Sequence, residues 1–600
     1  MADNNSKNRK ILFGLIACGI IICLLMVVIL LSIRVPVGDD PDPSEPNQPK
    51  VSLTELMQGV LSVKDDLKAI LQDMKDGNWA GAGAKADKIA VSIKASQKIV
   101  QSTRNLLGDN FFLGQQLDNI QNILNLADMG VSKLLKPLIV QLSTYPMDQL
   151  TVDDGIDTKW IGHYLDFAQT IMPEVETFLT LAETTDLSLI DSEGKLSGYL
   201  DMVKPLLALY HEYESMLPFL REFLGMEEDR LYLVAAQNSS EIRASGGFPG
   251  SMGTVRITDG VLKMGDFKSV YDVLATYTPK EANITAKENK LFHSGLKAPR
   301  DADYCPDFER VAYIWALGYE DKQKESVDGV ISLTPCVVQR LLAVTGSQIE
   351  LFDGTTLNGD NATKVLQYDL YYKYFGKEKI KNNAKIADQL FADAAKKLMA
   401  MLTENLEFSY IPGFLAVAQE SFADRTMMLW MNDEEQQNMV RALGWHGGLN
   451  EDPNYPQTGV YYSCTIASKM GWFLVMDTQI GERTKNGDGS YTYPITVTFS
   501  NTITTEEIWS ASGYIIGEKG GDLVGSAYFF APAGGTVSGF SVSNNKTVHT
   551  DVYKDLQLGY MLNFRIRPDQ VITVTYYVTT APGVETPLTF SKTPTVQVYH

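Results

Sequence analysis

Residues Leu231–Gly260 read LYLVAAQNSSEIRASGGFPGSMGTVRITDG and decide the fold of the central part of this 600-residue chain. Leu231–Ala236 is a short apolar run that predicts a buried strand, and Thr254–Thr258 predicts the next strand. A glycine-rich turn that includes Gly246 and Gly247 lies between them, and glycine permits positive φ and close backbone approach. The stretch therefore predicts a strand–turn–strand unit around which the rest of the chain is organised.

Polar side chains that follow the first strand form a candidate ligand site. Gln237 and Asn238 supply amides, and Arg243 offers a planar fork that can bind a phosphate or a carboxylate. Together with Glu241 and the two glycines of the turn, they predict a cradle for an anionic group. The alternative is a structural hairpin in which Arg243 pairs with Glu241 or with a nearby carbonyl group.

The same stretch resembles a known family. The resemblance rests on Gln237-Asn238, Glu241–Phe248, Gly250-Ser251 and Asp259-Gly260, and it continues through Asp303–Phe308, Val327–Ile331 and Leu341–Ala362. These segments are similar to the pattern of domain-of-unknown-function family 4012, a family of bacterial and archaeal envelope proteins. The resemblance implies a place in the cell envelope and leaves the activity open.

A membrane anchor is predicted near the N-terminus. Ile11–Ile33 is a charge-free, mostly apolar run that is long enough to span a bilayer. Lys7, Arg9 and Lys10 precede the run, and an acidic segment follows it, so the positive-inside rule places the N-terminus in the cytoplasm and the bulk of the chain outside. The run is too long for a signal-peptide core, which predicts an uncleaved, single-pass protein of the cytoplasmic membrane.

Composition and periodicity predict an α+β multidomain chain. Apolar residues recur at spacings of three and four in Leu53–Met74, and one face of Leu113–Met129 is apolar. Ala-rich Trp79–Leu107 and the segment Trp160–Leu181 predict further helices, whereas apolar residues alternate in Tyr493–Phe499. The alternating segments predict strands of a C-terminal β-sandwich, which are expected to pair among themselves and to fold as a separate domain. The predicted segments are 1–34 cytoplasmic tail and transmembrane helix, 35–50 Pro-rich acidic linker, 51–229 helical bundle stalk, 230–378 central mixed α/β domain with the family pattern, 379–457 helical segment and 458–600 C-terminal β-sandwich.

Charge and motif content exclude several functional classes. The formal net charge of −21 argues against nucleic acid as a partner. The sequence has no H-E-x-x-H, G-x-S-x-G or C-x-x-C pattern. Asp301, Asp303, Asp307 and Glu309 lie within nine residues, and their hard oxygens make Asp301 and Asp303 candidate Mg²⁺ or Ca²⁺ ligands; the alternative is a solvated acidic loop.

Two functional hypotheses follow. In the first, the chain needs no cofactor and binds or assembles envelope polymer, a lipid carrier or a partner protein. In the second, it is a metal-assisted phosphotransferase that attaches glycopolymer from a polyprenyl-linked sugar phosphate, similar in layout to LytR-CpsA-Psr proteins. Arg243 would then bind the pyrophosphate, and Asp301 or Asp303 would hold Mg²⁺. The lack of a familiar catalytic motif favours the first hypothesis.

Overall fold

The computed structural model describes residues 66–596, with gaps at 75, 108–110, 147–148, 153–154, 187–203, 205–206, 209, 212–213, 294, 378–383 and 405–409. The predicted anchor Ile11–Ile33 lies outside the described residues. Within them, no helix combines the length and the apolar character that a membrane crossing requires. The chain divides into two compact units, unit 1 (Met1–Glu227, Asp259–Val261 and Glu407–Ser409) and unit 2 (Glu228–Thr258, Leu262–Leu406 and Tyr410–His600).

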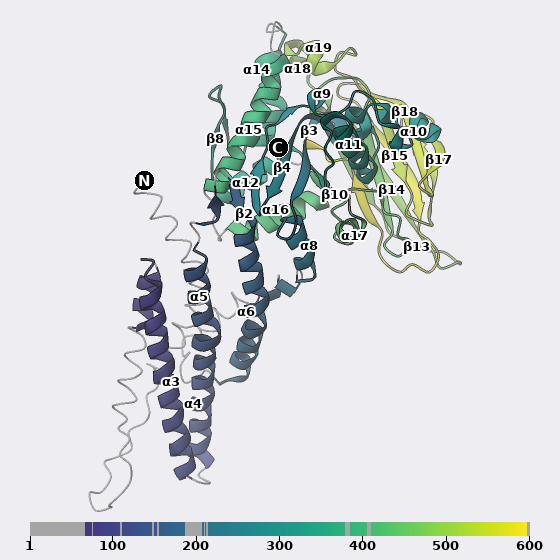
Figure 1. Cartoon of the computed structure of the whole chain (residues 1–600). Helices are drawn as coiled ribbons and strands as arrows, with labels where there is room; N and C mark the ends of the chain where they lie inside the picture. The colour runs from purple at the N-terminus through teal and green to yellow at the C-terminus, as the bar shows by residue number, and fades with distance from the viewer. Residues whose placement is uncertain are drawn as a thin grey trace, which may run out of the picture. The chain divides into compact units, whose positions relative to one another are not determined.

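Unit 1 is helical, as its spacing of apolar residues predicts (Figure 1). Its main helices are α3 (Trp79–Leu107), α4 (Phe111–Met129), the π-helix η1 (Gly130–Leu135), α5 (Lys136–Thr144), α6 (Thr158–Thr184) and α8 (Leu217–Phe223). Helix α3 has the predicted bounds because Gly77, at φ +73°, ends the preceding helical segment. Ile89, Leu124, Leu135 and Phe178 bring the apolar faces of four of these helices into one core.

A mixed sheet forms the centre of unit 2. Its strands follow the order β5 (Val261–Met264), β4 (Gly246–Thr258), β3 (Arg230–Arg243), β7 (Gly329–Leu333) and β10 (Met427–Met431). Strand β3 pairs antiparallel with β4 and parallel with β7. Helix α11 (Phe308–Gln323) lies on one side of the sheet, and α12 (Pro335–Thr345) and α16 (Ile411–Ala423) lie on the other (Figure 1). Strand β3 is therefore almost entirely buried.

The predicted strand–turn–strand unit is present, but its strands are longer than predicted. The glycine-rich segment was expected to be a turn, whereas Gly246 and Gly247 already belong to β4 and only Ala244-Ser245 separates the strands. The predicted helical segment 379–457 is also interrupted, because β10 separates α16 from α17 (Glu434–Ala442). An apolar run such as Met427–Met431 does not by itself distinguish a buried strand from a helix.

The C-terminal part forms two facing five-stranded sheets. One sheet has the order β17 (His549–Tyr553), β18 (Leu556–Ile566), β15 (Leu523–Phe530), β11 (Gln457–Cys464) and β20 (Thr589–Lys592), and the other has β12 (Leu474–Ile480), β14 (Tyr491–Asn501), β19 (Val571–Thr579) and β16 (Thr536–Val542), with β13 (Thr484–Lys485) beside β14. Val497, Phe529, Phe564 and Val574 fill the space between the sheets. Burial alternates along β14, as predicted for a sandwich strand.

The sheet that contains β11, β15 and β18 has a second buried face. Tyr461, Tyr528 and Tyr560 on this face belong to the same core as Phe308 and Trp315 of helix α11. The central sheet and the sandwich therefore share one hydrophobic core within unit 2. The prediction that the sandwich folds separately assumed that its sheets bury only the faces that they turn toward each other.

The three cysteines of unit 2 are all buried, and none of them forms a disulfide in the described part of the chain. Cys305 precedes α11, Cys336 is in α12, and Cys464 ends β11. They are therefore three separately buried thiols, and Cys305 and Cys336 form no disulfide with each other.

Candidate functional site

The first polar residues of the family motif hold the β3–β4 hairpin together. The Gln237 side chain is 1% exposed; its Nε2 donates to the Ser245 carbonyl at 2.9 Å, and its Oε1 accepts from Ser332 Oγ at 2.7 Å. Gly246 has φ +113°, and a Cβ there would overlap Gln237 Oε1. A Cβ at Gly247 would overlap the backbone of Asn238. These glycines serve close packing inside the hairpin, so they do not form an open cradle.

Asn238 and Glu241 connect the same hairpin to other parts of unit 2. Asn238 Nδ2 donates to the hydroxyl of Tyr371, and Glu241 accepts from Lys469 Nζ. Burial lowers the pKa of Lys469, but Glu241, Tyr371 and the nearby Tyr514 raise it by more, so the net shift is upward. The ammonium therefore stays charged at neutral pH. The alternative in which Glu241 pairs with Arg243 is therefore wrong: the partner of Glu241 is Lys469.

Arg243 ends β3 with its guanidinium inside the molecule. The side chain is 9% exposed, and Nη1 donates to the Cys464 carbonyl at 3.2 Å. The guanidinium carbon lies 3.7 Å from the centroid of the Tyr304 ring, and Nη2 lies 3.8 Å from Asp301 Oδ1. One hydrogen bond, one ion pair and one aromatic ring thus already contact the guanidinium, and an incoming phosphate would compete with these partners.

The structure brings Asp301 and Asp303 close to Arg243, although they are about 60 residues apart in sequence. Asp303 is fully buried, and neither of its carboxylate oxygens has a hydrogen-bond partner among the described residues. Burial raises the pKa of Asp303 well above its ordinary value, although Arg243 acts in the opposite direction. Full burial and a raised pKa both disfavour the ionised carboxylate that a hard cation requires as a ligand.

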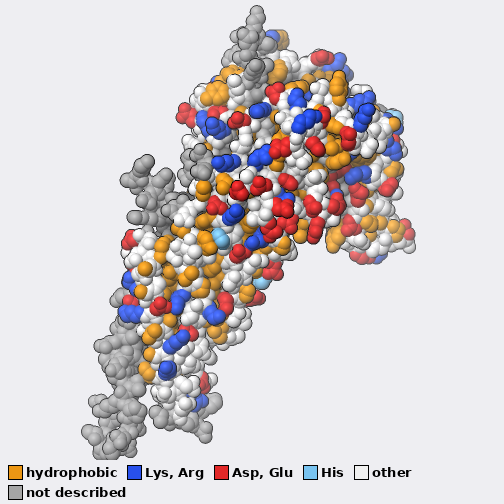
Figure 2. Space-filling view, in the orientation of Figure 1, with side chains coloured by type: hydrophobic (Ala, Val, Ile, Leu, Met, Phe, Trp, Pro, Cys, Tyr) orange, Lys and Arg blue, Asp and Glu red, His pale blue; other side chains and the backbone are white. Residues whose placement is uncertain are grey.

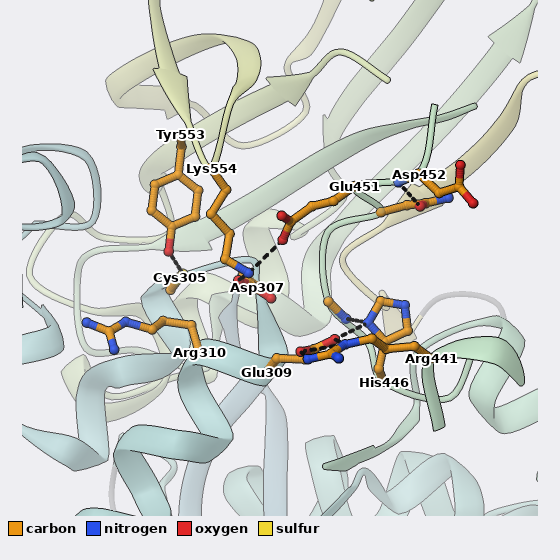
Figure 3. Close-up of polar contacts among 12 residues, drawn as sticks. Cys305, Asp307, Glu309, Arg310, Arg441, His446, Glu451, Asp452, Tyr553 and Lys554 are labelled. Carbon is orange, nitrogen blue, oxygen red and sulfur yellow. Dashed lines mark hydrogen bonds and ion pairs between the residues drawn. The ribbon is translucent and has the colours of Figure 1, made fainter. Parts of the chain in front are cut away.

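The other two acidic residues of the predicted cluster point to different partners (Figure 3). Lys554 Nζ lies 2.8 Å from Asp307 Oδ2 and 2.9 Å from Glu451 Oε1. Glu309 accepts from Arg441 Nη2 at 2.8 Å, and His446 Nδ1 lies 2.8 Å from its Oε1. In the part of the chain that the structure describes, no group of three or more acidic, His or Cys side chains is placed to hold a metal ion.

Glu309 is held in its ionised form. Burial raises its pKa, but the bonds from His446 and Arg441 outweigh burial and lower the pKa to about 2. Glu309 is 15% exposed on its side chain, so water screens these bonds only partly. It is therefore a fixed anion at the edge of a hollow.

This hollow has a volume of about 320 Å³. Its lining comes from three distant parts of the chain: Glu309, Arg310 and Tyr313 of α11, the segment that includes Trp430, Met431, Asn432, Glu434, Gln437 and Arg441, and Lys554 of the β17–β18 turn. Of these residues, Glu309 belongs to the acidic cluster seen in the sequence, and none of them was a predicted site residue. No spacing pattern could have found them, because residues from positions 309, 437 and 554 meet only in the folded chain.

Comparison with known proteins agrees with the resemblance. No curated protein and no solved structure matches this chain. One family model, described as "Protein of unknown function (DUF4012)", matches residues 227–371. The matched region includes β3, β4, β7 and α11, with Gln237, Arg243, Asp301 and Asp303. The central part of this chain is therefore a DUF4012 domain, as its sequence predicted.

Proposed function

We propose that this chain is a single-span, membrane-anchored extracytoplasmic protein that binds a cell-envelope component and performs no chemistry at its family motif. The observation that supports this proposal is the burial of the motif. Gln237, Asn238, Glu241 and Arg243 all bond to residues of unit 2, and the Arg243 side chain is only 9% exposed. A catalytic side chain must reach its substrate, whereas these side chains join a hairpin to its surroundings.

The hollow beside α11 is the surface at which such a component would bind. It is open to solvent through residues such as Asn432 and Glu434, which are exposed. It also combines donors, acceptors and aromatic rings, the chemistry of a recognition site. The envelope component would be polymer, a lipid carrier or a partner protein, and the apolar run Ile11–Ile33 would hold the protein at the membrane.

The binding proposal is tested with the full chain in detergent micelles. The chain should cosediment with insoluble envelope polymer and leave the polymer chemically unchanged. Protease added to spheroplasts should digest everything that follows Arg34. A chain that stays in the supernatant and is fully protected from protease would refute both parts of the proposal.

The alternative function is a metal-assisted phosphotransferase. It is supported by the proximity of Arg243 and Asp301, whose Nη2 and Oδ1 atoms lie 3.8 Å apart. Because Asp303 is fully buried and its pKa is raised, Asp301 would be the ligand for Mg²⁺. Mg²⁺-dependent transfer of saccharide from a polyprenyl pyrophosphate carrier, abolished by Asp301→Asn, would favour this alternative over binding alone.

A further inference from the structure

We propose that the hollow beside α11 binds an uncharged saccharide unit. This inference rests on the proposed function and names the chemical class that the binding surface would recognise. Four features of the described residues support it: the pairing of the charges, an unpartnered amide, the backbone of the turn that carries Lys554, and the two aromatic rings.

The cations that line the hollow are each paired with carboxylates. Arg310 Nε donates to Glu288 Oε1 at 2.8 Å, Arg441 bonds to Glu309, and Lys554 contacts Asp307. Such pairs leave further N–H groups and lone pairs available but cancel most of the local charge. The site therefore offers donors and acceptors side by side, which suits hydroxyl groups, because each hydroxyl can both donate and accept.

Overall charge argues against an anionic ligand. Figure 2 shows many Asp and Glu side chains on the face turned to the viewer, in line with the net charge of −21. The field of an acidic protein disfavours the approach of an anion unless a local excess of positive charge compensates. No such excess is present in the hollow, because its paired carboxylates neutralise its cations.

The second feature is the side-chain amide of Gln437, whose N–H donor is unpartnered among the described residues. The residue is 1% exposed, and its Oε1 accepts from the Met431 N–H at 2.7 Å, which fixes the orientation of the amide. Gln437 is one of the residues that line the hollow, and its buried Nε2 has no hydrogen-bond partner among the described residues. A buried donor without a partner destabilises the folded chain, so its presence at this position suggests that a ligand supplies the acceptor.

The turn that carries Lys554 is conformationally costly. Lys554 and Asp555 have φ +51° and +59°, which is the geometry of a two-residue hairpin turn normally built from Asn-Gly. Lys554 is neither Gly, Asn nor Asp, so the left-handed conformation strains its backbone. The turn places Lys554 between Asp307 and Glu451 at the edge of the hollow, as Figure 3 shows.

Tyr313 and Trp430 give the hollow an apolar wall. Their rings are 6.3 Å apart in an edge-on arrangement, and Tyr313 is only half-buried. An aromatic ring can pack against the C–H face of a pyranose while the polar groups bond to its hydroxyls. A volume of about 320 Å³ is at the small end of ligand sites, which suits one or two sugar rings.

The test measures binding to the full chain in detergent micelles by calorimetry. The probes are cellotriose, maltotriose and N-acetylated chitotriose, with glucuronate and inorganic phosphate as charged comparators. At least one uncharged trisaccharide should bind, and its Kd should change less than about twofold between about 50 and 500 mM NaCl, because salt screens only charged interactions. Tighter binding of glucuronate or phosphate, or no binding of the three trisaccharides, would overturn the inference.

Two variants locate the binding. Gln437→Glu keeps the acceptor for the Met431 N–H and replaces the free donor by an acceptor, so the Kd should rise about tenfold or more. Glu434→Gln should also weaken binding, whereas Glu435→Gln, an exposed neighbour outside the lining, is the matched control and should leave the Kd unchanged. If Gln437→Glu fails to fold, the Glu434 and Glu435 variants still decide the question.

Failure of this inference is separable from failure of the proposed function. If envelope polymer cosediments equally with the wild type and with Glu434→Gln, the binding function stands and the hollow is the wrong site. If no polymer cosediments but a trisaccharide binds with the predicted variant effects, the hollow is a saccharide site and the wider proposal fails.

Discussion

Replacing Arg243 by Ala should destabilise unit 2 rather than remove a ligand-binding group. The guanidinium donates to the Cys464 carbonyl at 3.2 Å, stacks 3.7 Å from the Tyr304 ring and lies 3.8 Å from Asp301. The variant would remove these contacts and leave a buried carbonyl and a partly buried carboxylate without their partner.

The expected loss can be estimated from these contacts. A hydrogen bond that involves a charged group contributes about 1.5–3 kcal/mol, and a desolvated cation–π contact contributes about 2 kcal/mol. Because the contacts share one side chain they are not additive, and the expected loss is about 3–5 kcal/mol. For a unit of roughly 370 residues this corresponds to a fall in Tm of about 4–6 °C.

Thermal unfolding of the full chain, followed by circular dichroism, measures this loss. Arg243→Lys should recover only part of it, because an ammonium reproduces neither the planar stack nor the fork. Arg256→Ala is the matched control: it lies on β4, its side chain is 48% exposed, and its pair with Glu325 should contribute less than about 1 kcal/mol. An unchanged Tm for Arg243→Ala, or full recovery by Arg243→Lys, would refute the structural role.

Three further predictions concern pH and domain boundaries. The pKa of Glu309 is lowered to about 2, so the ionised carboxylate stabilises the fold above its ordinary pKa of 4.5, and this stabilisation is lost as the pH falls toward 2. The difference in free energy of unfolding between the wild type and Glu309→Gln should therefore shrink by up to about 3 kcal/mol over this range, measured by denaturation at a series of pH values. The pKa of Asp303 is raised in the folded chain, so the unfolded chain loses this proton first and the stability falls as the pH rises above 3.8. Asp303→Asn should therefore raise the Tm at neutral pH. A lower Tm would contradict this and show that the fold requires the carboxyl group of Asp303. The fragment Tyr461–His600 exposes the second buried face of the sandwich, so it should bind a hydrophobic dye and unfold without cooperativity, whereas Glu228–His600 should unfold cooperatively. A short fragment that is compact and does not bind the dye would show that the sandwich folds by itself.

Local sequence patterns were sufficient for the individual elements. The Ala-rich run that follows Gly77-Asn78 predicted α3 with its observed bounds, because alanine has the highest helix propensity and glycine ends a helix. Alternation predicted β14, because successive side chains of a strand face opposite ways. The motif from Gln237 to Phe248 predicted the DUF4012 domain, and the two apolar runs around it predicted the β3–β4 hairpin.

The partners of these elements were decided by the tertiary structure. Periodicity shows that a face is buried but does not show what covers it, so the second buried face of β11 and β15 could not be predicted. Residue types alone made Arg243 a candidate for ligand binding, and only the fold supplied Cys464, Tyr304 and Asp301 as its partners. Hydrogen bonds and ion pairs act over a few ångströms in space, so a site whose groups are hundreds of residues apart in sequence exists only when the chain is folded.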